Sequence, residues 1–212
     1  MDKKGAIAVE AVTLWLLRIG IDQTGRFEPT QLWDIGVRGA VLADLWLAQR
    51  IADAGPSLEV DTTPTGVWYL DEATYELASG SMTQLGWIGR GRLRASDVAD
   101  QLVSNGEWSR HRSVTAAEWR RYRSHAIRQY MPLRTRLAHV YDGRIRTTTP
   151  IEATIAVLGH ALNVVRPDRF GHPRLRGLSP AACGTAQAVV EATVEEIFAF
   201  AGSVHANSNP AW

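Results

Sequence analysis

The stretch from Thr30 to Ala52, TQLWDIGVRGAVLADLWLAQRIA, is the feature that most constrains the fold. It holds more apolar residues than the single stripe of an amphipathic surface helix can take at the 3.6-residue period. A helix that is apolar nearly all round is a buried one, so we expect it at the centre of the protein. Gly36 and Gly39 cost about 1 kcal/mol each relative to alanine in a helix interior, which predicts that another element packs closely against them. Asp34 and Arg38 stand four positions apart, where they can face each other.

The other segments show helical patterns that can surround this central helix. A strand pattern is limited to the alternation around Leu58 and Val60. The fold predicted is therefore mainly α, a central buried helix surrounded by amphipathic helices, with at most a short hairpin. A chain of 212 residues fits a single domain, which we expect over residues 1–205 before a frayed tail at 206–212. Helices are expected at residues 6–19, 70–77, 96–106 with Ser96 as N-cap, 115–128, 133–141, 150–165 and 185–200.

Cysteine content and hydropathy indicate the compartment. Cys183 is the single cysteine of the sequence, which excludes an internal disulfide. No apolar run reaches the length of about 18 residues needed to span a bilayer. Glu10 lies inside the stretch that would have to form the core of a signal peptide. These observations predict a cytoplasmic protein.

Positive charge is concentrated in the middle of the chain. Between Arg90 and Arg146 there are 13 arginines and no lysine against five acids, although the formal net charge of the whole chain is only +1. Such a segment predicts an anionic partner, whether a phosphate head group, a nucleic acid or an acidic protein. The alternative is a solvated arginine-rich surface.

A short basic segment, GRGRLR, places Arg90, Arg92 and Arg94 immediately before the helix expected to begin at Ser96. Guanidinium groups and the first backbone N–H groups of a helix meet at such a place, which suits a phosphate. A loop with flexible arginines is the alternative. The preceding strand and the third glycine of a dinucleotide-binding loop are absent, which disfavours that kind of site.

The sequence contains no recognisable catalytic constellation. GxSxG, HExxH and Walker A patterns are absent, and the six histidines show no metal-ligand spacing. His160, on an otherwise apolar helix, fits a core or boundary histidine. We therefore predict no enzymatic activity, no catalytic residue, no metal and no cofactor.

Three segments in order resemble the Golgi phosphoprotein 3-like family. Val37–Ile51, VRGAVLADLWLAQRI, is similar to the family's central helix, with Asp44 where the family usually has glutamate. Pro64–Ala73, PTGVWYLDEA, matches its Pro-Thr-Gly and Leu-Asp-Glu-Ala motifs. Residues 149–165, TPIEATIAVLGHALNVV, resemble its late helix. The resemblance extends over roughly Leu14 to Phe200 and is that of a bacterial-type member.

The resemblance implies a mainly helical protein that binds the phosphatidylinositol 4-phosphate head group in a basic pocket, at the cytoplasmic face of a membrane. It also implies an adaptor for the tails of membrane enzymes. Arg38 corresponds to the pocket arginine of the family's central helix, and Arg92 to the first of two further pocket arginines. Ala95 stands at the second position, so Arg94 or Arg90 would have to substitute, and the lipid species stays open.

Two further family features differ in this sequence. Pro29 stands at the position of the membrane-facing tryptophan, and Trp33 or Phe27 would have to insert instead. The family's oligomerising β-hairpin, expected after Gly106, is not evident, which leaves the oligomeric state open.

Two other functions remain possible on the sequence alone. Residues 92–112 resemble the second half of a winged-helix module, with a helix, a turn at Gly106 and a basic flank, as in a nucleic-acid-binding protein. The following residues look helical where the wing strands should be, which disfavours nucleic acid as the partner. A protein adaptor that needs no lipid would share the same fold.

Overall fold

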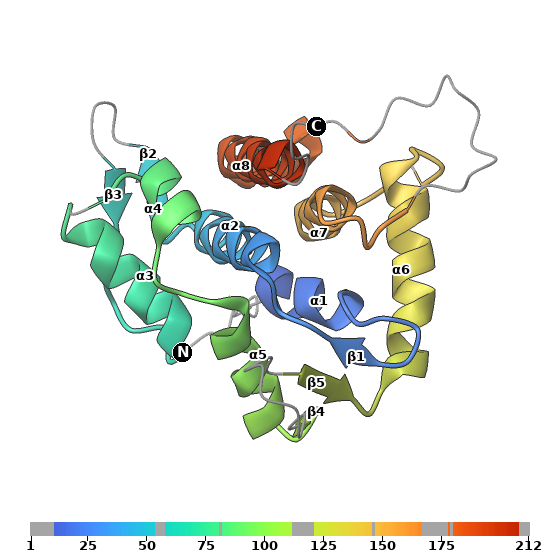
Figure 1. Cartoon of the computed structure of the whole chain (residues 1–212). Coiled ribbons are helices and arrows are strands. Elements are labelled where there is room, and N and C mark those ends of the chain that lie inside the picture. The colour runs from blue at the N-terminus through green and yellow to red at the C-terminus, as the bar shows by residue number, and fades with distance from the viewer. Residues whose placement is uncertain are drawn as a thin grey trace, which may run out of the picture.

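The computed structural model of the protein describes residues 11–53, 58–80, 82–111, 121–145, 147–166, 178 and 180–207. Helix α2 (Gln31–Leu47) runs through the middle of it, and other helices surround α2 (Figure 1). Thr30 caps α2 by accepting a hydrogen bond from the backbone N–H of Trp33 at 3.4 Å. Nearly every residue from Trp33 to Leu45 is buried, which confirms α2 as the central helix.

The rest of the described chain is also mainly helical, as predicted. Two antiparallel sheets are small: one has the strand order β1, β5, β4, and the other pairs β2 with β3. The remaining helical segments are α1 (Ala11–Ile19), α3 (Trp68–Ala78), α4 (Gln84–Arg90), α5 (Ala95–Ser104), α6 (Ile127–Tyr141), α7 (Pro150–Ala161), the 3₁₀ segment η1 (Pro180–Ala186) and α8 (Gln187–Asn207). The strands are β1 (Arg26–Phe27), β2 (Ile51–Asp53), β3 (Leu58–Val60), β4 (Trp108–His111) and β5 (Arg121–Ser124).

The two glycines of α2 lie where neighbouring elements come close, as predicted. A Cβ atom at Gly36 would lie 2.7 Å from a methyl group of Leu162, just after α7. At Gly39 it would lie 2.2 Å from Oγ1 of Thr193 on α8. Both distances are far below van der Waals contact, so these positions allow α7 and α8 to pack directly on the α2 backbone.

A buried carboxylate joins α1 to α2. The Oδ1 atom of Asp44, which is 3 % exposed, accepts from the backbone N–H of Val12 at 2.8 Å. Its Oδ2 atom accepts from the backbone N–H of Thr13 at 2.9 Å and from the Thr13 hydroxyl at 2.7 Å. These groups belong to the first turn of α1, where N–H groups have no partner inside the helix, so Asp44 caps α1 from another element.

The segment after Gly106 differs from the helix predicted at residues 115–128. Residues 121–124 form β5, which pairs with β4 on one side and with β1 on the other. Trp108, Tyr122 and Phe27 are buried together, with ring centroids 5.4 to 6.2 Å apart. These aromatic side chains come from the three paired strands, one from each, and their packing across the strands stabilises the sheet here. Of the rest of the predicted helix, residues 115–120 lie outside the described residues, and only Ile127 and Arg128 are helical, as the first residues of α6.

Several predicted boundaries also change. The central helix ends at Leu47 rather than Ala52, because Gln49 adopts a φ of 57° and the chain turns into β2. Helix α4 was not predicted. Helix α5 is capped at Arg94 instead of Ser96, and α8 continues past Phe200 to Asn207.

An ion pair connects α1 to the turn before β4. Arg18 donates from Nε to Oε2 of Glu107 at 2.9 Å and from Nη2 to Oε1 at 2.7 Å. The hydroxyl of Tyr130 donates to the same carboxylate at 3.3 Å. The hydrogen bond from Arg18 is the main reason that the pKa of Glu107 lies below the ordinary glutamate value near 4.5.

This ion pair predicts a pH-dependent stability. Because the pKa of Glu107 is lower in the folded state, its contribution is present above the ordinary glutamate value and is lost as the pH falls through the folded pKa. We expect Glu107→Gln to lower the free energy of unfolding by about 1 kcal/mol at about pH 7, and by progressively less towards about pH 3. Urea unfolding at a series of pH values measures this. An equal loss at every pH would contradict the assignment.

Candidate functional site

Arg38 lies on the face of α2 that meets α4, and its guanidinium points at the segment that links α4 to α5. Nε donates to the carbonyl oxygen of Ile88 at 2.6 Å, and Nη2 to that of Gly89 at 3.2 Å. Nη1 donates to the carbonyl oxygens of Gly91 and Leu93, each at 3.1 Å. A single buried side chain thus binds four backbone carbonyls between residues 88 and 93. We call residues 88–94 the α4–α5 segment.

Burial determines the electrostatics of Arg38. The residue is only 5 % exposed, and removal from water lowers the pKa of its guanidinium. The carboxylates of Asp34 and Glu196 oppose that shift by raising the pKa. The carboxylate of Asp34 accepts a hydrogen bond from the backbone N–H of Ala95 at 2.8 Å. Its effect on Arg38 is therefore a charge–charge attraction, while the hydrogen bonds of the guanidinium go to backbone carbonyls.

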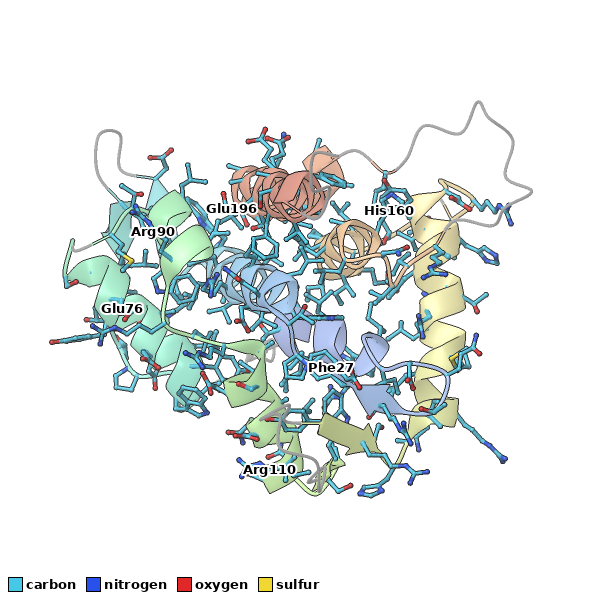
Figure 2. All side chains as sticks on the ribbon, viewed as in Figure 1. Phe27, Glu76, Arg90, Arg110, His160 and Glu196 are labelled. Carbon is cyan, nitrogen blue, oxygen red and sulfur yellow. The ribbon has the colours of Figure 1, made fainter. Side chains whose placement is uncertain are left out.

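The other three candidate arginines lie on the same segment and are exposed. Arg90 is the last residue of α4, Arg92 lies in the connection, and Arg94 caps α5. Figure 2 labels Arg90 on α4 and Glu196 on the neighbouring helix α8. The fold therefore brings together all four arginines singled out in the sequence, three with their side chains outside and Arg38 beneath them.

The N-terminus of α5 is occupied by carboxylates. Asp34 accepts the N–H of Ala95 at 2.8 Å, and Asp97 accepts the N–H of Arg94 at 3.0 Å. This corrects the expectation that a helix N-terminus near Ser96 would help to hold a phosphate. Two carboxylates already satisfy these donors and would repel an anion there, so an anion at this site has to be held by the arginine side chains.

Trp33 and Phe27 are core residues in this structure. Trp33 is 9 % exposed and Phe27 only 1 %. Their rings contact each other edge to face, with centroids 4.9 Å apart. In this conformation neither ring is available to a bilayer, because each packs against the other and against the sheet.

Acidic residues surround the arginines and limit the positive potential. Arg92 lies near Glu72 of α3, and burial is the main reason why the pKa of Glu72 is raised. Glu76 and Asp97 raise it further, and Arg92 lowers it in part. The site is therefore a mixed surface in which the arginines, and not a broad basic face, are the groups available to an anion.

Sequence reasoning missed one residue that the site requires. A Cβ atom at Gly91 would lie 2.6 Å from the carbonyl oxygen of Trp87 and 2.9 Å from Cδ of Arg38. Gly91 therefore leaves room for the Arg38 side chain to reach the carbonyls. The spacing of the two glycines in GRGRLR is the only sequence signal for it, and it gave no indication of which side chain would fill the space.

The antiparallel pair of β4 and β5 changes the argument about nucleic acid. Strands β4 and β5 now follow α5, where the winged-helix interpretation needs them. Helix α5 itself carries Asp97 and Asp100 and no lysine or arginine. Asp100 accepts from Nε of Arg110 at 2.7 Å and from the hydroxyl of Tyr122 at 2.8 Å. An acidic helix in the recognition position would face the phosphates of a duplex with like charge, which disfavours DNA binding through α5.

These features define a helical domain in which a buried arginine of the central helix supports an exposed segment rich in arginine. The family model for Golgi phosphoprotein 3 (GPP34) matches residues 14–197, and the chain belongs to this family. Comparisons with curated proteins and with solved structures gave no match. Among the described residues, none of the helices is long and apolar enough to span a bilayer, and no three His, Cys, Asp or Glu side chains gather as metal ligands would.

Proposed function

We propose that the protein binds the phosphorylated head group of an anionic phospholipid and associates peripherally with the cytoplasmic face of a membrane. The ligand class is a phosphoinositide similar to phosphatidylinositol 4-phosphate. Arg90, Arg92 and Arg94 are the residues that would contact the phosphate. The observation that carries the proposal is the exposure of these three arginines on a segment fixed by Arg38, in a chain of the GPP34 family.

The chemistry of the three side chains suits this ligand. Guanidinium groups form charge-assisted, bidentate hydrogen bonds with phosphate oxygens, and they keep their charge at any physiological pH. Near an anionic leaflet each arginine contributes up to about 1 kcal/mol of attraction, whether or not it contacts a head group. A backbone that is already ordered reduces the entropy lost on binding.

An adaptor role for membrane enzymes is part of the same proposal. Membership of the Golgi phosphoprotein 3 family supports it. No surface of the described residues is assigned to an enzyme tail. A lipid-independent protein adaptor therefore remains the second candidate, and the two functions differ in whether the protein binds vesicles.

Liposome co-sedimentation near physiological salt tests the proposal. Vesicles with phosphatidylinositol 4-phosphate are compared with phosphatidylserine vesicles of equal charge. We expect preference for the phosphoinositide, and we expect Arg92→Ala and Arg94→Ala each to weaken binding by about 1 kcal/mol or more, which is at least about fivefold. Arg128→Ala, at an exposed position of α6, is the control for loss of one positive charge.

The other outcomes separate the alternatives. Equal binding to both kinds of vesicle would mean a basic membrane-surface protein without a head-group site. Absence of binding to either would favour the lipid-independent adaptor. Salt-dependent binding to duplex DNA without lipid binding would restore the nucleic-acid function.

A further inference from the structure

We propose that the protein binds one acyl chain of its anionic phospholipid in an apolar hollow beside α4, and that Arg90 contacts the phosphodiester that joins this chain to the head group. The inference rests on the proposed function, since it takes the ligand to be a lipid similar to phosphatidylinositol 4-phosphate. It adds a site for the hydrocarbon part of the same molecule. Arg92 and Arg94 remain the residues that would hold the phosphate on the inositol ring.

The hollow lies between the β2–β3 pair, the end of α3 and the start of α4, which are neighbours on one side of α2 (Figure 1). Its volume is about 730 Å³, and it is partly open to solvent. The apolar side chains that line it are all aliphatic among the described residues: Leu58, Val60, Leu77, Ala78, Met82 and Leu85. An aliphatic wall without aromatic rings suits a flexible hydrocarbon chain, which gains by leaving water there.

The walls of the hollow exist without a ligand. Leu58 and Val60 alternate with the exposed Glu59, so they point to the same face of the β2–β3 pair. Both are only half-buried, and Leu85 at the rim is 56 % exposed. A hydrocarbon chain that covers such side chains removes apolar surface from water on both partners, and the gain grows with the area covered. The hollow therefore favours an apolar occupant.

Arg90 places a positive charge at the edge of the hollow. A Cβ atom at Gly86 would lie 3.8 Å from Nη2 of Arg90 and 3.2 Å from Oγ1 of Thr83. The guanidinium therefore lies beside Gly86, one turn back along α4, and Thr83 itself lines the hollow. Long side chains in helices lean towards the N-terminus, which accounts for this direction. An aliphatic surface and a guanidinium side by side match a lipid, whose chain is apolar and whose phosphodiester is anionic.

Charge also determines the direction in which the lipid would lie. Among the lining residues that the structure describes, Asp53 on β2 is the one charged side chain, and it would repel a phosphate. The phosphodiester is therefore favoured at Arg90 and the chain towards β2 and β3. The seven residues of α4 span about 10 Å, so Arg92 and Arg94 follow at the other end of this helix. The order along the protein then matches the order in the lipid: chain, phosphodiester, ring, ring phosphate.

Calorimetric titration with ligands of increasing chain length tests the inference. The ligands are the soluble head group inositol 1,4-bisphosphate and the dibutanoyl and dioctanoyl forms of phosphatidylinositol 4-phosphate, kept below the concentration at which micelles form. We expect the affinity to rise at least about tenfold from the head group to the dioctanoyl lipid, because the apolar contact grows with the chain. Equal affinity for the three ligands would overturn the inference.

Two variants locate the chain in the hollow. Ala78→Phe fills the hollow from an exposed position at the end of α3, and Leu85→Gln makes the rim polar without a change of charge. Each should reduce the gain from chain length at least about fivefold and leave the affinity for the head group within about twofold. Ala188→Phe, at an exposed alanine of α8 outside the hollow, is the matched control and should keep the gain. If both hollow variants keep it too, the chain binds elsewhere and the inference is wrong.

The contact between Arg90 and the phosphodiester has its own test. Dioctanoyl phosphatidylserine has the chain and the phosphodiester but no ring phosphate. Arg90→Gln should therefore weaken the binding of this lipid and of dioctanoyl phosphatidylinositol 4-phosphate by the same factor, at least about fivefold. If only the phosphoinositide loses affinity, Arg90 contacts the ring phosphate, and the proposed direction of the lipid is wrong.

The outcomes separate this inference from the proposed function. If dioctanoyl phosphatidylserine binds as tightly as the phosphoinositide, head-group recognition fails, and the hollow variants still decide whether a chain binds there. If the phosphoinositide is preferred but chain length has no effect, the function stands and the acyl-chain site fails. If no ligand binds, both fail. Circular dichroism melting establishes that the variants are folded, and Leu85→Gln serves as the second variant should Ala78→Phe not fold.

Discussion

Asp44→Ala is expected to lower the free energy of unfolding by about 3 kcal/mol. The substitution removes a buried carboxylate that accepts three hydrogen bonds from the first turn of α1, at 2.7 to 2.9 Å. The N–H groups of Val12 and Thr13 would then be left in an apolar environment without a partner, and this accounts for most of the loss. Denaturant unfolding followed by circular dichroism measures the effect.

Two further variants sharpen this test. Asp53→Ala removes an exposed carboxylate at the end of β2 and should change the stability by less than about 0.5 kcal/mol. Asp44→Asn keeps the shape but replaces one acceptor oxygen by a donor, so it should recover only part of the loss. If Asp44→Ala were as mild as Asp53→Ala, the contact between α1 and α2 would not depend on this carboxylate.

Gly39→Ala is expected to destabilise the protein by about 2 to 3 kcal/mol, through overpacking rather than through a lost contact. The added methyl group would lie 2.2 Å from Oγ1 and 2.3 Å from Cγ2 of Thr193. Thr193 is β-branched, fully buried, and bonded through its hydroxyl to the carbonyl oxygen of Val189 at 2.6 Å. Its branched side chain is stiff at χ1 and surrounded by packed atoms, so α8 would have to move away from α2.

The matched control for Gly39→Ala lies on the partner helix. Gly202→Ala places the same methyl group in open space on α8, and it should stabilise the protein slightly, by up to about 1 kcal/mol, through helix propensity. Thr193→Gly combined with Gly39→Ala should cost less than the sum of the two single changes, because the collision is then removed. Additive losses in this double-mutant cycle would show that the two positions do not meet.

The structure also explains why the arginine pattern alone was ambiguous about function. The four arginines have two different environments: Arg38 is buried beneath the α4–α5 segment, and Arg90, Arg92 and Arg94 are exposed on it. The same guanidinium chemistry binds carbonyls in one case and is available to an anion in the other. Burial is what separates the roles, and burial depends on the packing of α4 against α2 and α8.

Much of the helical framework followed from periodicity in the sequence. The excess of apolar residues from Trp33 to Leu45 identified the buried helix, because no surface helix can hide so many. Gly36 and Gly39 indicated close neighbours because glycine destabilises a helix interior relative to alanine. Such a residue is expected where a neighbouring element packs too closely for a side chain. Thr149 and Pro150 marked the start of α7, where Thr149 accepts the N–H of Glu152 at 3.2 Å.

The antiparallel pair of β4 and β5 could not be predicted in the same way. Residues 121–124 carry an arginine-rich pattern that fits a helix face as well as a strand. They form β5 because Trp108 on β4 and Phe27, which lies far away in the sequence, complete the aromatic cluster around Tyr122. A strand is stabilised by partners that its own sequence does not contain, so tertiary packing overrides the local pattern.

The sequence by itself therefore determined the central helix, the mainly helical fold, the family resemblance and the four arginines of the candidate site. Only the tertiary structure decided which of those arginines are exposed, that the rings of Phe27 and Trp33 are buried, and which groups cap α5. Arg38 finds its carbonyls 50 to 55 positions later in the chain, and Asp34 caps Ala95 61 positions later. Periodicity reports which side of an element faces the core, but hydrogen-bond partners at such separations depend on how the elements pack.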